Sequence, residues 1–237
     1  MSFAGKLYSR VLQLAVDRML REWWRHQTNP LNALQKRATL ESADFIAEFG
    51  GTAILYYDRK RHLLEALKAA PGEGMILEFG VHRGESLRWI AKEVGERRIH
   101  GFDSFDGLPD GGGGTHWHKH QFDRGSMLPK VPASVTLHKG WFNETLPSFL
   151  ESQSEKSVAF IHIDCDLYES TKDIFEILEP YFLPGSVIAF DEFYNVPNWR
   201  QHEFKAFSEF RERTKFDCKY IGFSEQQASA ILCEGNP

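Results

Sequence analysis

Acidic side chains gather at two points of the sequence. Asp164 and Asp166 follow one apolar run, and Asp191 and Glu192 end another. If both runs are strands of one parallel sheet, their carboxyl ends lie at the same edge and the four carboxylates meet in a small volume. Their repulsion then requires a cation or retained protons, and Mg²⁺ is the simplest hard ion for oxygen ligands. The alternative is that one acid caps a helix while another is solvated; the metal is the favoured interpretation.

A glycine-containing turn precedes these acids. Residues 78–84 read Glu-Phe-Gly-Val-His-Arg-Gly, and glycines at such a turn let the backbone approach a ligand at a helix N-terminus. Further along, Asp103 is placed to accept hydrogen bonds from both ribose hydroxyls of a nucleoside cofactor, with a helix N-cap as its alternative role. The turn differs from the dinucleotide fingerprint G-x-G-x-x-G, because an acid precedes its first glycine. That acid suits the cationic S-adenosylmethionine better than a pyrophosphate, so a methyltransferase is favoured over a dehydrogenase.

Short β-rich runs alternate with helical patterns after residue 71, which is typical of βαβ units and a parallel sheet. The predicted strands are residues 75–79, 99–102, 135–137, 158–163, 186–190, 219–223 and 228–233. The link between the last two is too short for a crossover helix, so they form an antiparallel hairpin. The predicted fold is therefore α/β: a doubly wound, Rossmann-like, mostly parallel seven-stranded sheet that ends in a hairpin. It resembles class I methyltransferases.

The N-terminal region has a helical residue pattern and few strand signals. Apolar residues alternate with arginines up to the break at residues 28–30, and a second helical stretch is interrupted by Gly50 and Gly51. We expect a helical lid or oligomerisation segment at residues 1–70 and a methyltransferase domain at 71–237. The Arg-rich helix could instead lie on a membrane surface, but its apolar positions spread around the helix, which favours a lid or a homo-oligomer contact.

Four strings of the sequence carry a family resemblance. They are Phe-Ile-His-Ile-Asp-Cys-Asp-Leu-Tyr-Glu-Ser-Thr, Glu-Phe-Gly-Val-His-Arg-Gly, Gly-Phe-Asp-Ser-Phe-Asp-Gly-Leu-Pro and Lys-Gly-Trp-Phe-Asn-Glu-Thr-Leu-Pro. Together they resemble the macrocin O-methyltransferase family over residues 75–195. The resemblance implies methylation of sugar hydroxyls on natural products, with S-adenosylmethionine and Mg²⁺.

The resemblance also implies roles for individual residues. Asp164, Asp191 and Glu192 would hold the metal, although the family has two aspartates where this chain has Asp191-Glu192. Asp166 would be the general base, and Trp141 or Phe142 would lie near the adenine. The candidate cofactor-binding residues are Glu78, Phe79, Gly80, Arg83, Gly84, Ser86, Asp103, Ser104, Trp141 and Asp164.

Three groups of histidines have competing interpretations. His116, His118 and His120 alternate within a glycine-rich stretch at residues 111–120, where a mobile lid is favoured over a metal site. His162 lies within a predicted buried strand, so a structural role is favoured. His202 follows the fifth predicted strand and is retained as a second candidate catalytic base.

Composition limits the remaining classes. A net charge of −5 argues against nucleic-acid binding, which requires a basic surface. The three cysteines form no zinc pattern or CxxC pair, and there is neither a signal-peptide pattern nor an apolar stretch of about 20 residues for membrane insertion, so a cytoplasmic location is expected. The expected function is a Mg²⁺-dependent O-methyltransferase with a small hydroxylated acceptor. The alternatives are a metal-independent methyltransferase and a non-catalytic nucleoside- or partner-binding module.

Overall fold

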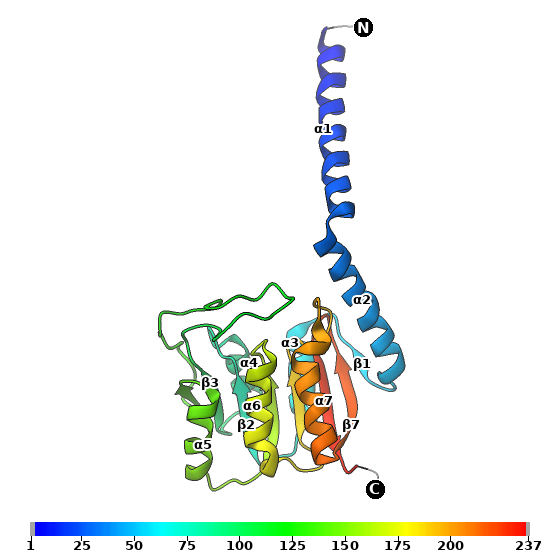
Figure 1. Cartoon of the computed structure of the whole chain (residues 1–237). Coiled ribbons are helices and arrows are strands. Elements are labelled where there is room, and N and C mark those ends of the chain that lie inside the picture. The colour runs from blue at the N-terminus through cyan, green and yellow to red at the C-terminus, as the bar shows by residue number, and fades with distance from the viewer. Residues whose placement is uncertain (1–2, 236–237) are drawn as a thin grey trace.

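Eight strands form one sheet with helices on both faces, and a helical arm leaves it at the N-terminal end (Figure 1). The structure is a computed structural model that describes residues 3–235. The strands are β1 (Ile54–Leu55), β2 (Met75–Phe79), β3 (Ile99–Asp103), β4 (Val135–Lys139), β5 (Val158–Ile163), β6 (Val187–Phe190), β7 (Asp217–Phe223) and β8 (Ala228–Cys233). The helices are α1 (Phe3–Thr28), α2 (Pro30–Phe49), α3 (Arg59–Lys68), α4 (Glu85–Val94), α5 (Phe142–Ser152), α6 (Tyr168–Leu178) and α7 (Glu203–Thr214), with 3-10 turns η1 (Glu179–Tyr181) and η2 (Trp199–Gln201).

The strand order is β1-β7-β8-β6-β5-β2-β3-β4, and every pairing is parallel except those of β8 with β6 and β7. The predicted α/β fold with a terminal hairpin is therefore confirmed. The described residues contain one strand more than predicted, because β1 pairs in parallel with β7 at the sheet edge. A two-residue strand inside a helical stretch has no periodicity from which to recognise it. The N-terminal segment, residues 1–70, which was predicted to be helical, thus contributes both β1 and α3 to the sheet layers.

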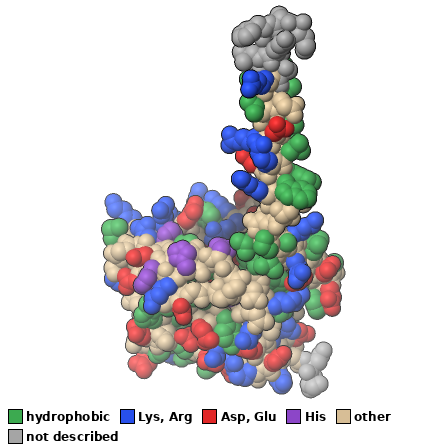
Figure 2. Space-filling model, turned by 45° about the horizontal axis from the view of Figure 1, so that its top comes forward, with side chains coloured by type: hydrophobic (Ala, Val, Ile, Leu, Met, Phe, Trp, Pro, Cys, Tyr) green, Lys and Arg blue, Asp and Glu red, His purple; other side chains and the backbone are tan. Residues whose placement is uncertain are grey.

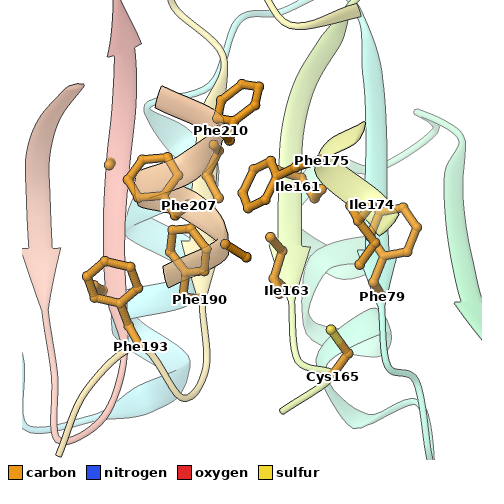
Figure 3. Close-up of a cluster of buried hydrophobic side chains, with 14 of the residues drawn as sticks. Phe79, Ile161, Ile163, Cys165, Ile174, Phe175, Phe190, Phe193, Phe207 and Phe210 are labelled. Atoms are coloured by element: carbon orange, nitrogen blue, oxygen red, sulfur yellow. The ribbon is translucent and has the colours of Figure 1, made fainter. Parts of the chain in front are cut away.

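The strands are covered on both faces, as their continuous apolar character predicts. In β5, Ile161 and Ile163 join the core under α5, α6 and α7, whereas Phe160 joins the core under α3 and α4. Figure 3 shows the first of these cores, in which Phe175 of α6 and Phe207 of α7 face the sheet. Burying each such side chain contributes about 1.5–3 kcal/mol. The cores hold the strand ends in place, and the candidate site lies at those ends.

The N-terminal arm consists of α1 and α2. Asn29 separates them, because its side-chain oxygen accepts a hydrogen bond from the backbone N–H of Leu31 and caps α2. Phe45 anchors α2 by packing its ring against Trp199 and Phe204, each at 5.6 Å between centroids. Figure 2 shows α1 projecting from the body with apolar and basic side chains exposed. None of the described helices is both long and apolar enough to cross a membrane.

Candidate functional site

A cavity of about 540 Å³ lies at the carboxyl ends of β2, β3, β5 and β6. Its volume is within the range of small-molecule sites. The predicted site residues that line it are Gly80, Asp103, Ser104, Trp141, Asp164, Asp166, Asp191 and Glu192, together with Phe142. The sheet topology therefore brings both acid pairs and the glycine turn to one place.

The turn after β2 is held by Asp103 at the end of β3. Gly80 has a φ of 90°, in the region that favours glycine, and a Cβ there would overlap a backbone carbonyl at the end of β5. Oδ2 of Asp103 accepts hydrogen bonds from the backbone N–H groups of Val81 and His82, at 2.8 and 2.7 Å. Oδ1 accepts one from the N–H of Phe105 at 2.7 Å. A carboxylate offers about four acceptor positions, so about one is left for a ribose hydroxyl, rather than the two expected.

Glu78 lies beneath the cavity and does not line it. The side chain is fully buried, and it accepts hydrogen bonds from Ser86 Oγ at 3.0 Å and His162 Nδ1 at 2.9 Å. Burial alone lowers the pKa of His162, but the hydrogen bond and charge of Glu78, with the nearby aspartates, raise it above its ordinary value. The geometry places Glu78 as the partner of a buried histidine that supports the site from below. His162 has the structural position favoured from the sequence.

An arginine bridges the two aspartates at the ends of β5 and β6. Arg59, the first residue of α3, donates from Nη2 to Asp164 Oδ2 at 2.8 Å and from Nε to Asp191 Oδ1 at 2.6 Å. The sequence analysis missed Arg59, because it lies 105 residues from Asp164 in a stretch with no chemical motif. Its guanidinium supplies one positive charge to a site with several acids.

The remaining acids have no cationic partner among the described residues, and their burial favours the protonated form. Burial, with the charge of Asp191, raises the pKa of Asp166 to about 7. Burial also raises the pKa of Glu192 well above its ordinary value. Glu203, which the sequence analysis missed, is fully buried and its pKa is likewise raised by burial, then by Asp166. Within the described chain, neither carboxylate oxygen of Glu203 has a hydrogen-bond partner.

The donor set can be tested against a divalent cation. His162, Asp164 and Asp191 each offer one atom, and these atoms lie within 4.8 Å of one another. Among residues 3–235, this group contains His162 where the sequence led us to expect Glu192. Glu192 Oε2 is nevertheless buried beside the aspartates and lacks a hydrogen-bond partner among the described residues. The carboxylate oxygens of Asp164, Asp191 and Glu192 fit a hard ion such as Mg²⁺. For the ion to bind, the guanidinium of Arg59 must leave the two aspartates.

Several predicted site residues lie away from the cavity wall. Phe79 belongs to the core and stacks on Phe102 at 4.9 Å between ring centroids. Arg83, Gly84 and Ser86 belong to the turn and first turn of α4, but they do not border the cavity. Their predicted contacts with a cofactor remain predictions.

The second candidate base, His202, also lies off the cavity wall. It is buried against the ring of Trp117, at 5.3 Å between centroids, and its burial lowers its pKa. Its Nε2 has no hydrogen-bond partner in the part of the chain that the structure describes. The catalytic role of His202 remains a prediction, and direct proton transfer would require it to reach the cavity.

The connection between β3 and β4, residues 104–134, forms one wall of the cavity. Trp117 anchors it in the core, and Asn198 Nδ2 donates a hydrogen bond to the backbone oxygen of Gly113 at 3.2 Å. The neighbouring His116, His118 and His120 are exposed, and across residues 3–235 they do not form a metal-binding group. The wall is therefore attached to the start of α7 by a buried tryptophan.

A family comparison covers the part of the chain that surrounds this cavity. Residues 77–193 match a family model described as "Methyltransferase domain". The matched stretch contains Gly80, Asp103, Asp164 and Asp191, each of which lines the cavity.

Curated relatives are O-methyltransferases of natural products. The "8-demethyl-8-(2,3-dimethoxy-alpha-L-rhamnosyl)-tetracenomycin-C 4'-O-methyltransferase" of Streptomyces olivaceus is 31% identical over 158 residues, which cover 57% of this chain and 59% of the relative. The "Mycinamicin III 3''-O-methyltransferase" of Micromonospora griseorubida is 27% identical over 177 residues, covering 65% and 66%. The matched stretches thus span less than two thirds of each relative.

Solved structures share the fold. A calicheamicin methyltransferase superimposes with a TM-score of 0.58 at 23% identity, covering 86% of this chain and 93% of that chain. The O-methyltransferase NovP superimposes with a TM-score of 0.57 at 22% identity, covering 74% of this chain and 79% of that chain. Residues 77–193 are thus similar in sequence to methyltransferase domains, and the chain shares the fold of solved methyltransferases.

Proposed function

We propose that this protein transfers the methyl group of S-adenosylmethionine to a hydroxyl oxygen of a sugar or another polyhydroxylated small molecule, with Mg²⁺ as a cofactor. The observation that carries the proposal is the shared cavity: the Gly80 turn and Asp103 border one side, and the acids after β5 and β6 border another. The names of the relatives, which specify O-methylation of a rhamnosyl-tetracenomycin and of mycinamicin III, support the class of acceptor.

The cofactor would lie along the edge formed by Gly80 and Asp103. The backbone can approach a ligand closely at Gly80, and Asp103 holds that turn through two N–H bonds, from Val81 and His82. Trp141 lines the same cavity and is 38% exposed, so its ring is available to cover an adenine. These residues would position the sulfonium methyl toward the acids.

The acids would position and deprotonate the acceptor. A divalent ion held by Asp164, Asp191 and Glu192 would lower the pKa of a bound hydroxyl. Asp166, whose pKa is raised to about 7, would accept the hydroxyl proton, since a base works best with a pKa near the working pH. The cavity walls would align oxygen, methyl carbon and sulfur, and such positioning supplies several kcal/mol of barrier reduction.

Calorimetric titration and thermal unfolding test the cofactor. S-adenosylmethionine and S-adenosylhomocysteine should bind in the titration and raise the melting temperature, and NAD should do neither. Stabilisation by NAD alone would refute the proposal.

The variant Asp164→Ala tests the metal and the chemistry. It should remove Mg²⁺ binding and lower methyl transfer by about 100-fold or more. Glu151→Ala, an exposed acid on α5, is the matched control and should change neither. Unchanged transfer and unchanged metal dependence in Asp164→Ala would show that the acid assignment is wrong.

The Arg59 bridge favours a second candidate, the same transfer without a metal. The guanidinium already compensates two of the expected ligands. Activity that survives EDTA treatment would support this candidate over the first.

The arm is the proposed site of homo-oligomer contact. Between Tyr8 and Trp24, the helix α1 exposes apolar side chains, among them Leu12, Met19 and Trp23. Sedimentation of the full chain and of the Trp23→Glu variant tests this: the variant should be smaller if α1 joins two copies.

A further inference from the structure

Arg59 takes up the same two carboxylates that a divalent ion would need. Its Nη2 lies 2.8 Å from Asp164 Oδ2 and its Nε lies 2.6 Å from Asp191 Oδ1. One planar guanidinium therefore joins the ends of two neighbouring strands. Such charge-assisted bonds are about twice as strong as those between neutral groups.

A guanidinium and a divalent ion cannot share this pair of carboxylates at low cost. Mg²⁺ requires carboxylate oxygens at about 2.0–2.1 Å and a nearly octahedral shell. The guanidinium carbon would then lie a few ångströms from a double positive charge, and the repulsion is large where the surroundings are partly buried. The side chain of Asp191 is only 7% exposed, so solvent screens little on that side.

The position of Arg59 allows its side chain to leave without unfolding α3. Asp58 caps the helix through a 2.6 Å bond from the N–H of Arg61, which holds the backbone in place. The Arg59 side chain is 41% exposed and lines the cavity, so it can turn toward solvent. His162, which lies beside the same carboxylates, is buried and hydrogen-bonded to Glu78, so it stays in place.

We propose that Arg59 and a divalent cation are alternative occupants of the Asp164–Asp191 pair, and that Arg59 thereby sets the metal affinity of the site. The inference rests on the proposed metal-binding function. Arg59 lies in α3, before the stretch that matches the methyltransferase family model. In the metal-free protein it holds the two carboxylates together, and it competes with the ion for them.

Calorimetric titration of MgCl₂ into the full chain at constant ionic strength, without S-adenosylmethionine, tests the competition. Arg59→Gln should bind Mg²⁺ about tenfold more tightly than the wild type, which corresponds to about 1.4 kcal/mol. This is less than two charge-assisted bonds would suggest, because the side chain is partly exposed. Arg61→Gln is the matched control: the same charge is removed from an exposed position of the same helix, and the affinity should equal that of the wild type.

Thermal unfolding provides a second readout. In EDTA, Arg59→Gln should melt below the wild type, because Asp164 and Asp191 lose their counter-charge; Mg²⁺ should restore the loss and raise the melting temperature more than it does in the wild type. Arg59→Lys should fall between the two, since an ammonium is a single point charge without the planar fork. If Arg59→Gln fails to fold, Arg59→Lys tests the same competition, with a smaller expected gain in Mg²⁺ affinity.

The outcomes separate this inference from the proposed function. Equal Mg²⁺ affinity in wild type and Arg59→Gln, or weaker affinity in the variant, would overturn the competition and leave the metal site standing. Mg²⁺ binding to neither protein would refute the metal site and this inference together, while S-adenosylmethionine binding in the same samples would keep the methyltransferase proposal intact.

Discussion

Replacing Glu78 by alanine is expected to destabilise the protein strongly, because it leaves the buried imidazole of His162 without its partner. Glu78 and His162 are opposite each other in the register of β2 and β5, and their side chains are 0% and 2% exposed. The substitution removes the 2.9 Å bond from His162 and the 3.0 Å bond from Ser86. Removing one partner of a buried ion pair costs about 3–5 kcal/mol. For a domain of this size that lowers the melting temperature by roughly 6–20 °C.

The stability that Glu78 contributes through His162 is expected to depend on pH. The pKa of His162 is raised above its ordinary value, because the bond and charge of Glu78 outweigh the effect of burial. A raised folded-state pKa contributes stability that is fully present below the unfolded-state pKa and is lost as pH rises through the folded value. The stability difference between wild type and Glu78→Gln, which keeps an acceptor but removes the charge, should therefore be largest near pH 6 and shrink as pH rises toward 9.

Thermal and urea unfolding at about pH 6, 7.5 and 9 measure both effects. Glu73→Ala, an exposed acid in the turn before β2, is the control and should match the wild type. The reasoning is refuted if Glu78→Ala melts within about 2 °C of that control at pH 6, or if the gap between wild type and Glu78→Gln widens with pH.

Three other substitutions test the site and its support. Gly80→Ala should lower the free energy of unfolding by about 2 kcal/mol or more in urea titrations, since φ is 90° and a Cβ meets backbone, whereas Gly72→Ala has open space and should change little. Burial, with a neighbouring charge, raises the pKa of Asp166 to about 7, so Asp166→Asn should raise the melting temperature at pH 8.5 but not at pH 5. The same variant should lower kcat by about 100-fold if Asp166 is the base. Trp117→Ala should cost about 3–5 kcal/mol and expose its loop to limited proteolysis, because that ring is the buried anchor.

The positions of the acids at the cavity could be predicted because strand ends follow from local patterns. Alternating strand and helix signals imply a parallel sheet, and parallel strands present their carboxyl ends at one edge. Asp164, Asp166, Asp191 and Glu192 each follow or end such a strand and line the cavity in the structure.

Motif membership alone was a poorer guide to side-chain direction. Phe79 lies within the turn motif but points into the core against Phe102, because successive residues of a strand face opposite sides. Glu78 has the acid type expected near a cofactor, yet it is buried under the cavity with His162. Both distinctions depend on which elements cover each face of the sheet.

The sequence by itself determined the class of fold, the order of its strands along the chain and the edge at which its acids collect, since these depend on periodicity and short links. Only the tertiary structure decided which charges compensate one another. Arg59 reaches Asp191 across 132 residues, and Glu78 reaches His162 across 84. Such pairs carry no local signal, because the partners meet only after strands and helices have packed into layers.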